Sequence, residues 1–323
     1  MASIAYNISP RVRRHIRSSE ELLTKLLTSP LSPQDELRNS WGTTIERVFY
    51  SSKLTGMQLT KDQIARLLTL NPTPPIKVGD ISQDLVELVN YKSAIDYIHN
   101  EWVAANKPIS LDMVKTLYDI ACLPTKGEPG QLYNSRLPEI KAFLQYIQAG
   151  NEHPIIQAAI AHIQILLISP FTVGNGTVAR LLGYLFMANQ GYTFRKMLTL
   201  EEFFFTNLEN TKEVRDIVKK SQNFTLWIEY YTWGIAAQLK KSVEKVERNV
   251  DIPEIPVSFW KLNKRQKEIV NKLQNPDMFI TNKDVQTSFG VSQITASRDL
   301  AKLAKLGIVV QKGKGRSTYY IKI

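Results

Sequence analysis

One apolar segment constrains the fold of this chain more than any other. From Pro154 to Leu167 most residues are apolar, on all sides of the helix that such a run would form. Because a helix without a polar face must be covered all round, the segment predicts a buried central helix in an α-helical bundle. His153 and His162 would lie about 180° apart on it, which excludes a shared metal site and favours capping or core roles.

A turn-forming loop follows this helix directly, from Ser169 to Arg180, and a second helical pattern continues beyond it. The triplet Gly174-Asn175-Gly176 lets backbone N–H groups point outward at a helix N-terminus, an arrangement that binds anions. Most Gly-Asn-Gly triplets are ordinary loops, so the triplet alone leaves both interpretations open.

The helix and the loop together resemble the active-site region of Fic (filamentation induced by cAMP) domain proteins. Members of that family carry His-Pro-Phe-x-(Asp/Glu)-Gly-Asn-Gly-Arg-x-x-Arg after a helix. In this chain a serine stands at the histidine position, a valine at the carboxylate position and a threonine at the first arginine position. The family residues kept are Pro170, Phe171, Gly174, Asn175, Gly176 and Arg180, and the departures are Ser169, Val173 and Thr177.

The resemblance implies a mostly α-helical fold, namely a Fic-like helical bundle with a small β-hairpin flap. In the family, a target protein segment lies extended against the flap by strand addition. Without the resemblance, the same stretch would be interpreted as a solvated loop. Tyr133 stands where the family usually has an arginine, and the flap positions are Gly130, Gln131, Leu132 and Tyr133.

An N-terminal segment partly matches the family's inhibitory helix, (Ser/Thr)-x-x-x-Glu-(Gly/Asn), whose glutamate pairs with the second motif arginine. Ser51 and Gly56 fit this pattern, but Thr55 stands at the glutamate position. A hydroxyl cannot supply the charge-assisted bond that a carboxylate gives an arginine. The resemblance therefore implies that Arg180 lacks its usual partner. A plain helix end with a glycine cap would also explain the segment.

The three departures remove the groups on which the family's reaction depends. That reaction transfers a nucleotide monophosphate, usually AMP from ATP, to a protein hydroxyl (AMPylation). Serine is no base near neutral pH, valine cannot hold Mg²⁺, and threonine carries no charge. Loss of a general base costs roughly 10²–10⁴ in rate, and loss of an electrostatic stabiliser roughly 10²–10³. We expect a strongly impaired enzyme without an intact catalytic residue or Mg²⁺, which retains weak binding of ATP or another phosphate-containing ligand.

Basic charge is concentrated near the C-terminus. Residues 251–323 hold 13 Lys and Arg against 6 Asp and Glu, a net charge of +7 within a total of +11. The same residues show a helix over 262–273, a capping-box-like start at Thr281, a third helix from Ser292, and two strands around a basic tip. An excess of this kind indicates a polyanionic partner.

Helix, helix, turn, helix and a basic two-stranded ribbon together resemble a winged helix-turn-helix of the bacterial regulator type, a small α+β domain. A third helix with small polar residues at its start can enter the ~12 Å major groove, while a basic ribbon tip meets phosphates. We therefore expect binding of double-stranded DNA, and a role in dimerisation or protein contact is the alternative. The predicted DNA contacts are Gln293, Thr295, Ser297, Arg298, Lys312, Lys314 and Arg316.

The expected organisation is an N-terminal helical region over 1–75, a Fic-like core over 76–250 and a winged helix over 251–323, with linkers at 71–76 and 251–256. A single cysteine, and the lack of an apolar run of about 18 residues, predict a cytoplasmic protein with no membrane partner. Three functions stay open: a catalytically silent Fic protein coupled to a DNA binder, an atypical nucleotidyl or phosphoryl transferase acting on protein hydroxyls, and a non-catalytic protein-interaction module. The target, the operator and a homodimeric state also stay open.

Overall fold

The computed structural model describes residues 4–69, 83–99, 108–122, 131–149, 152–248, 262–273, 278–305, 309–313, 315 and 318–322. The chain divides into two compact units, Met1–Ile252 and Pro253–Ile323. Both segments predicted as linkers, 71–76 and 251–256, lie outside the described residues.

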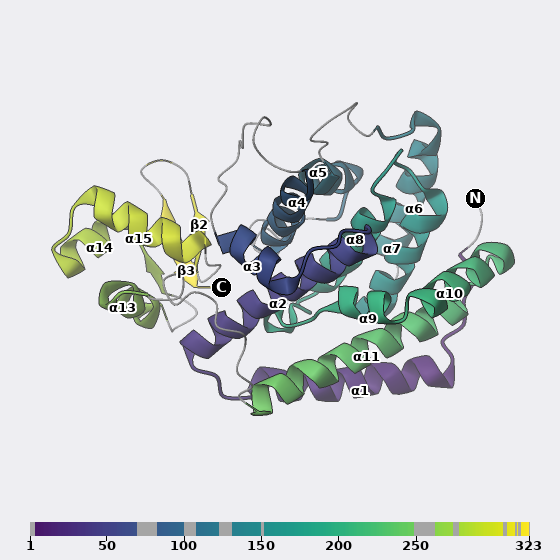
Figure 1. Ribbon diagram of the computed structural model, residues 1–323, viewed down its shortest axis with the longest axis horizontal. Coiled ribbons are helices and arrows are strands. Elements are labelled where there is room, and N and C mark those ends of the chain that lie inside the picture. Colours follow the sequence, from purple (N-terminus) through teal and green to yellow (C-terminus); the bar gives the residue numbers. More distant parts are fainter. Residues whose placement is uncertain are drawn as a thin grey trace. The chain divides into compact units, whose positions relative to one another are not determined.

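Helices dominate the first unit, as predicted (Figure 1). They are α1 (Pro10–Thr28), α2 (Pro33–Leu54), α3 (Lys61–Thr69), α4 (Gln83–Tyr97), α5 (Leu111–Cys122), α6 (Leu137–Ala149), α7 (Pro154–Ile168), α8 (Asn175–Asn189), α9 (Leu200–Thr206), α10 (Leu208–Ser221) and α11 (Thr225–Arg248), with short 3₁₀ helices η2 (Asn134–Arg136) and η3 (Phe194–Lys196). Among the residues that the structure describes, no helix is long and apolar enough to cross a membrane.

Helix α7 is the buried centre of this unit, and α6, α8 and α11 pack against it. The fully buried indole of Trp227 donates to the carbonyl oxygen of Ala159 over 2.9 Å, which joins α11 to α7. His153 caps the helix, because its Nδ1 accepts the N–H of Ile155. His162 lies in the aromatic core. The predicted central helix and the capping and core roles of the two histidines are confirmed.

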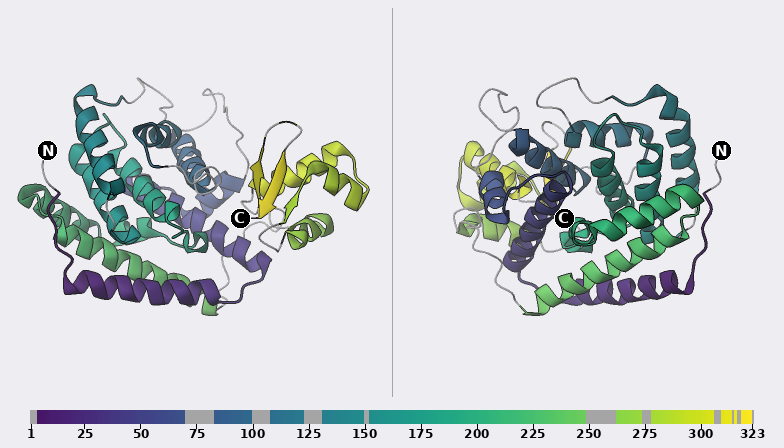
Figure 2. Two further views of the ribbon diagram at one scale, coloured as in Figure 1. Left: turned by 180° about the vertical axis from the view of Figure 1, so that it is seen from behind. Right: turned by 45° about the vertical axis from the view of Figure 1, so that its right-hand side comes forward.

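The two N-terminal helices pack onto the same core. Helices α1 and α11 lie side by side along their lengths (Figures 1 and 2), and α2 contacts α4 and α9. Ser9 and Ser32 cap these helices just before a proline, the usual pairing at a helix start. The guanidinium of Arg195 donates to the carbonyl oxygens of Leu26 and Ser29 at the end of α1. These hydrogen bonds satisfy carbonyl groups that have no donor within the helix at its C-terminal end.

In its described residues, the second unit has helices and a small sheet, namely α13 (Lys264–Lys272), β1 (Phe279–Ile280), α14 (Asn282–Phe289), α15 (Gln293–Lys305), β2 (Val309–Lys312) and β3 (Tyr319–Lys322). The capping box of Thr281 and Asp284 is confirmed. The predicted two-stranded ribbon is formed by β2 and β3, and β1 adds a third antiparallel strand that was not predicted, in the order β1-β3-β2. In that pairing Phe279 lies opposite Ile321. A strand of two residues carries no alternation that a sequence pattern could reveal.

Helix α15 is anchored to the rest of its unit by one apolar face and one buried carboxylate. Ala296, Leu300 and Leu303 are fully buried, as predicted. The carboxylate of Asp299 accepts from Gln266 on α13 over 2.7 Å and also pairs with Arg265. These contacts fix which side of α15 faces solvent.

Candidate anion-binding loop and nucleic-acid interface

The loop between α7 and α8 starts at a residue with a left-handed backbone. Ser169 ends α7 with φ 45° and ψ 62°, and its hydroxyl donates to the carbonyl oxygen of Leu166 over 2.8 Å. A side chain other than glycine at positive φ is uncommon, and this hydrogen bond within the last turn supports it. The hydroxyl at the motif's histidine position is therefore engaged by its own helix.

Two residues fix the shape of the loop before α8 begins. Gly174 has φ 79°, and a Cβ added there would lie 2.7 Å from Sγ of Cys122, so the position excludes a side chain for conformational and steric reasons. Burial raises the pKa of that thiol to about 12. The amide of Asn175 accepts from the N–H of Phe171 over 3.0 Å and donates to its carbonyl oxygen over 2.7 Å. Asn175 therefore holds the loop closed from within.

The start of α8 keeps the backbone features of an anion site. Gly174 stands at the N-cap, and no side chain of the described residues caps this helix end. The first N–H groups of a helix have no partner within the helix, and they favour a negative charge. The geometry at 174–176 is thus compatible with the predicted binding of a phosphate group.

A short extended segment runs beside the loop at the predicted flap. Leu132 forms an antiparallel bridge with Phe171. On either side of it, the N–H of Tyr133 donates to Pro170, and the N–H of Thr172 donates to Gln131. Gly130 and the other arm of the predicted hairpin lie outside the described residues. One edge of the flap segment is therefore paired with the loop.

Arg180 on α8 has no glutamate partner at position 55, and two hydroxyl groups accept hydrogen bonds from it instead. Its Nη2 donates to the hydroxyl of Ser51 over 2.8 Å, and it approaches the hydroxyl of Thr177 at 3.4 Å. Ser51 is buried in the last turn of α2, and it belongs to the segment that resembles the inhibitory motif. Nε of Arg180 is buried and has no hydrogen-bond partner among the described residues. The partner is a neutral hydroxyl, so the cation keeps its net charge.

The other two positions of that segment form an ordinary helix end. The hydroxyl of Thr55 donates to the carbonyl oxygen of Ser52 over 2.9 Å. Gly56 has φ 93°, and a Cβ there would meet no atom within 4 Å, so only its backbone conformation calls for glycine. The segment therefore ends as an ordinary glycine-capped helix and also contacts Arg180 through Ser51.

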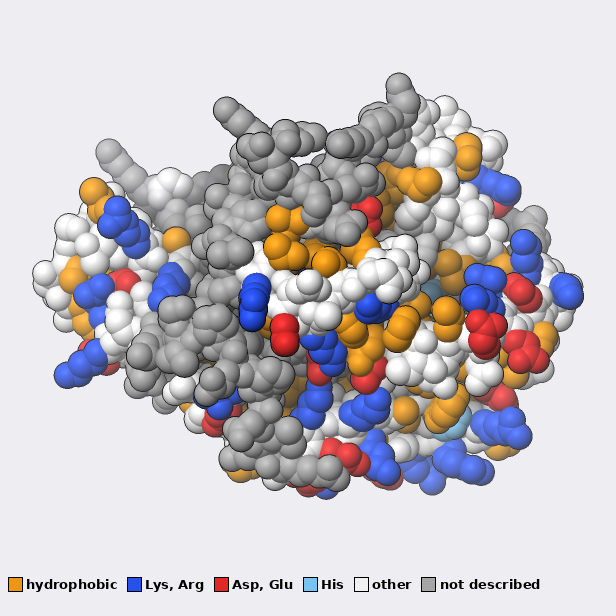
Figure 3. Space-filling view, in the orientation of Figure 1, with side chains coloured by type: hydrophobic (Ala, Val, Ile, Leu, Met, Phe, Trp, Pro, Cys, Tyr) orange, Lys and Arg blue, Asp and Glu red, His pale blue; other side chains and the backbone are white. Residues whose placement is uncertain are grey.

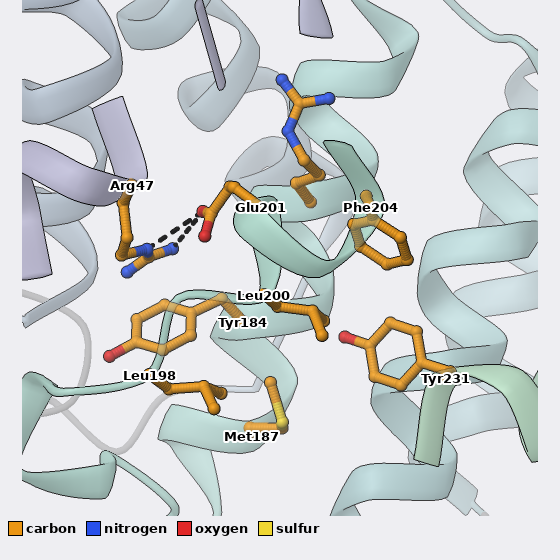
Figure 4. Close-up of a pocket in the computed structure, with 9 residues that line it drawn as sticks. Arg47, Tyr184, Met187, Leu198, Leu200, Glu201, Phe204 and Tyr231 are labelled. Carbon is orange, nitrogen blue, oxygen red and sulfur yellow. Dashed lines mark hydrogen bonds and ion pairs between the residues drawn. The ribbon is translucent and has the colours of Figure 1, made fainter. Parts of the chain in front are cut away.

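Arg180 also lines a small cavity of about 10 Å³ that the sequence did not indicate (Figure 4). Arg47 and Glu201 form an ion pair at its wall, with Nη2 and Oε1 2.9 Å apart and side chains that are 4% and 3% exposed. Tyr91 donates to the same carboxylate oxygen over 2.7 Å. Oε2 of Glu201 has no partner among the described residues. The sequence offered one indication of this ion pair, namely that Arg47 lies between the apolar positions Ile45 and Val48.

The departures from the motif change the side chains that the loop presents. The side chain of Val173 is apolar and 60% exposed, where the motif has a metal-binding carboxylate. Thr177 offers only a hydroxyl beside Arg180. The described part of the chain holds no group of three or more His, Cys, Asp and Glu residues that could bind a metal ion.

In the second unit, the solvent face of α15 carries two of the predicted base contacts, Gln293 and Ser297, and one predicted phosphate contact, Arg298. Gln293, Ser297 and Arg298 are exposed. Thr295 is half-buried, and both its N–H and its hydroxyl contact the hydroxyl of Ser292, which caps the helix. Its hydroxyl is thus engaged at the helix start. Figure 3 shows Lys and Arg side chains over α14 and α15 with single hydrophobic side chains among them.

The predicted phosphate contacts are only partly described. Lys312 ends β2 opposite Tyr319, and the glycines at 313 and 315 have φ of 77° and 59°, which suit a tight turn. Lys314 and Arg316 lie outside the described residues. Ile294, which is not among the predicted contacts, is also exposed and lies off the buried face of α15.

Comparison with known proteins agrees with this architecture. The sequence model of the Fic/DOC family matches residues 108–187, and that of the DeoR-like helix-turn-helix domain matches residues 265–320. The chain therefore contains a Fic domain followed by a DeoR-like helix-turn-helix domain, and both predicted domain types are confirmed.

Three solved structures have a similar fold. A Fic family protein from Desulfovibrio desulfuricans G20 aligns with a TM-score of 0.61 and 14% identity, over 98% of this chain and 97% of that one. Fic-1 from C. elegans gives 0.59 and 18%, over 72% and 71%. A Fic domain containing signaling protein from Bacteroides thetaiotaomicron VPI-5482 gives 0.54 and 18%, over 76% and 99%.

Proposed function

We propose that this chain is a DNA-binding regulator whose Fic domain is strongly impaired in AMP transfer. One observation carries the catalytic half of the proposal. The loop keeps its structural residues, since Gly174 and Asn175 hold it in place, while the hydroxyl of Ser169 is bonded to its own helix and Val173 offers no ligand atom. A general base must accept a proton near neutral pH, which serine does not.

The DNA-binding half rests on the second unit. Its helix α15 is held by a buried apolar face and by Asp299, and it presents Gln293, Ser297 and Arg298 to solvent. Residues 251–323 carry a net charge of +7. A rigid helix with polar residues at its N-terminal end, in a basic domain, suits the major groove of DNA. A regulator of this kind would act in the cytoplasm, on the cell's own DNA.

The experiment has two readouts on the full chain. Incubation with Mg²⁺, ATP and a cell lysate, followed by mass spectrometry, should show no AMP or phosphate adduct on protein hydroxyls. Gel retardation at about 50 mM salt, where the electrostatic contribution is large, should show binding to duplex DNA. An adduct that disappears in Arg180→Ala would overturn the catalytic half, and absence of retardation would overturn the DNA-binding half.

A second candidate function is the capture of a protein segment at the flap. Tyr133 is 48% exposed, and the flap segment uses one edge to pair with Phe171. A peptide could add to a segment of this kind through backbone hydrogen bonds, with Tyr133 as a side-chain contact. Crosslinking from a photoreactive group at position 133 in a lysate would support this candidate if DNA retardation is absent.

A further inference from the structure

Ile294 is the most exposed of the large hydrophobic side chains in the described part of the chain, at 65%. It is the second residue of α15, and it lies off the buried face formed by Ala296, Leu300 and Leu303. The core of the domain therefore does not explain an isoleucine at this position. A large aliphatic side chain left in water forgoes the favourable free energy of burial, which a bound partner can recover.

The surroundings of Ile294 favour a nucleic acid as that partner. Gln293, Ser297 and Arg298 are exposed beside it on the same helix, so a single aliphatic group is set among polar and cationic ones. The core of a protein interface is more apolar than this and depleted of charge. The major groove, in contrast, is polar and anionic, and it carries one apolar feature, the 5-methyl group of thymine.

The position of Ile294 is well fixed. The side chain of Asn282 on α14 donates to the hydroxyl of Ser297 over 2.8 Å and to the carbonyl oxygen of Gln293 over 3.3 Å. Ser292 caps the helix just before Ile294. A β-branched residue in a helix has one strongly preferred χ1 rotamer, so little side-chain entropy is lost when it makes a contact.

We propose that Ile294 contacts a thymine 5-methyl group in the major groove and thereby contributes to the sequence preference of the domain. This inference rests on the proposed DNA binding and adds the chemical feature that is recognised. The methyl group enters van der Waals contact with the exposed side chain, while Gln293 and Ser297 meet hydrogen-bonding groups of neighbouring base edges. A thymine is thereby distinguished from a cytosine or an unmethylated uracil at one base step.

The test uses a duplex that the full chain selects from a random library. Each thymine of the selected duplex is replaced in turn by deoxyuridine, which removes the methyl group and keeps the base pair. We expect affinity to fall about four-fold at one position or a few, the change that corresponds to one buried methyl group. In Ile294→Ala the same replacement should have no effect. The matched control is Ile217→Ala, an exposed isoleucine on α10 in the first unit, which should keep the four-fold dependence.

The outcomes separate this inference from the function on which it rests. If a duplex is selected but no deoxyuridine replacement weakens binding, or if Ile294→Ala keeps the dependence, the inference is overturned and DNA binding stands. If the full chain selects no duplex from the library, sequence-specific DNA binding and the inference are overturned together.

Discussion

Nη2 of Arg180 donates a hydrogen bond to the hydroxyl of Ser51 over 2.8 Å and so connects α8 to the last turn of α2. The two residues are 129 positions apart in the sequence. A hydroxyl holds the guanidinium in place without neutralising it. The cation therefore stays positioned next to the helix start at 174–176, where a bound anion would lie.

The first prediction concerns anion binding at this helix start. Inorganic phosphate and ATP should bind with dissociation constants from millimolar to high micromolar, about 4–6 kcal/mol, because one cation and a helix N-terminus are present without a metal ligand. Titration calorimetry on the full chain measures this. Arg180→Ala should abolish binding. The exposed Arg215 on α10 offers a matched control, and Arg215→Ala should leave affinity unchanged. Equal affinities in wild type and Arg180→Ala would show that the loop is only structural.

The second prediction is a rescue of chemistry. Ser169→His, Val173→Asp and Thr177→Arg together should produce detectable self-modification with Mg²⁺ and ATP, since the three changes restore a base, a metal ligand and a second cation. Val173 is largely exposed, so an aspartate there disturbs no core packing. Ser169→His alone should give no adduct by intact-mass spectrometry. An adduct in the wild type or in the single variant would contradict this account of the impairment.

The third prediction separates positioning contacts from base contacts in the second unit. Each cation that meets a phosphate adds about 0.9 to the slope of log affinity against log salt. Arg298→Ala and Lys314→Ala should therefore weaken binding to all duplexes alike and flatten that slope. Gln293→Ala should leave the slope nearly intact and relax sequence preference, as measured by fluorescence anisotropy on matched duplexes. An unchanged sequence preference in Gln293→Ala would contradict the assignment of this residue to a base edge.

The fourth prediction concerns acid stability. Burial, and secondarily the charge of Arg180, lower the pKa of His162 to about 3 in the folded chain. The unfolded chain takes up a proton near pH 6.5, so the stability contribution is complete above that pH and is lost as pH falls towards 3. By pH 5 the free energy of unfolding should drop by about 2 kcal/mol from this residue.

Urea unfolding between pH 7.5 and 5 measures this loss. His162→Gln should flatten the dependence, since glutamine takes up no proton in either state. The dependence that remains reports on groups such as His99, whose pKa is also lowered well below its ordinary value by burial. An unchanged pH dependence in His162→Gln would show that this histidine does not contribute.

The fifth prediction concerns the buried ion pair. Arg47→Met should reduce the free energy of unfolding by about 3–5 kcal/mol, because Glu201 would remain buried without its counter-charge. The double change Arg47→Met with Glu201→Leu removes both charges and should cost much less. Denaturant unfolding followed by tryptophan fluorescence compares the two. Equal losses would mean that packing, and not charge, stabilises this contact between α2 and α9.

The helices could be predicted from the sequence because their signals are local. The apolar run of α7, the caps at Ser292 and Thr281 and the glycine after α8 act within a few residues. The same local patterns identified the loop at 174–176, because its backbone geometry depends on glycine.

The contacts that connect distant segments could not be predicted in this way. Arg180 with Ser51 and Arg47 with Glu201 are tertiary pairs, and nothing in either segment alone indicates the other. The sequence therefore did not predict that Ser51 would bind Arg180 in place of the motif's glutamate. Strand β1 was not predicted for a different reason, namely that its two residues form a strand only through their pairing with β3.

The closeness of Gly174 to Cys122 also makes the reactivity of this thiol a reporter of the loop's conformation. Cys122 is the only cysteine in the chain, so a thiol reagent has one place to react. The side chain is partly buried beside Gly174, and its raised pKa leaves almost no thiolate at neutral pH. Alkylation should be faster when residues around 174 move away from α5, because the thiol is then more accessible. We therefore expect a ligand that binds at this loop to slow the labelling of Cys122 in the unaltered protein.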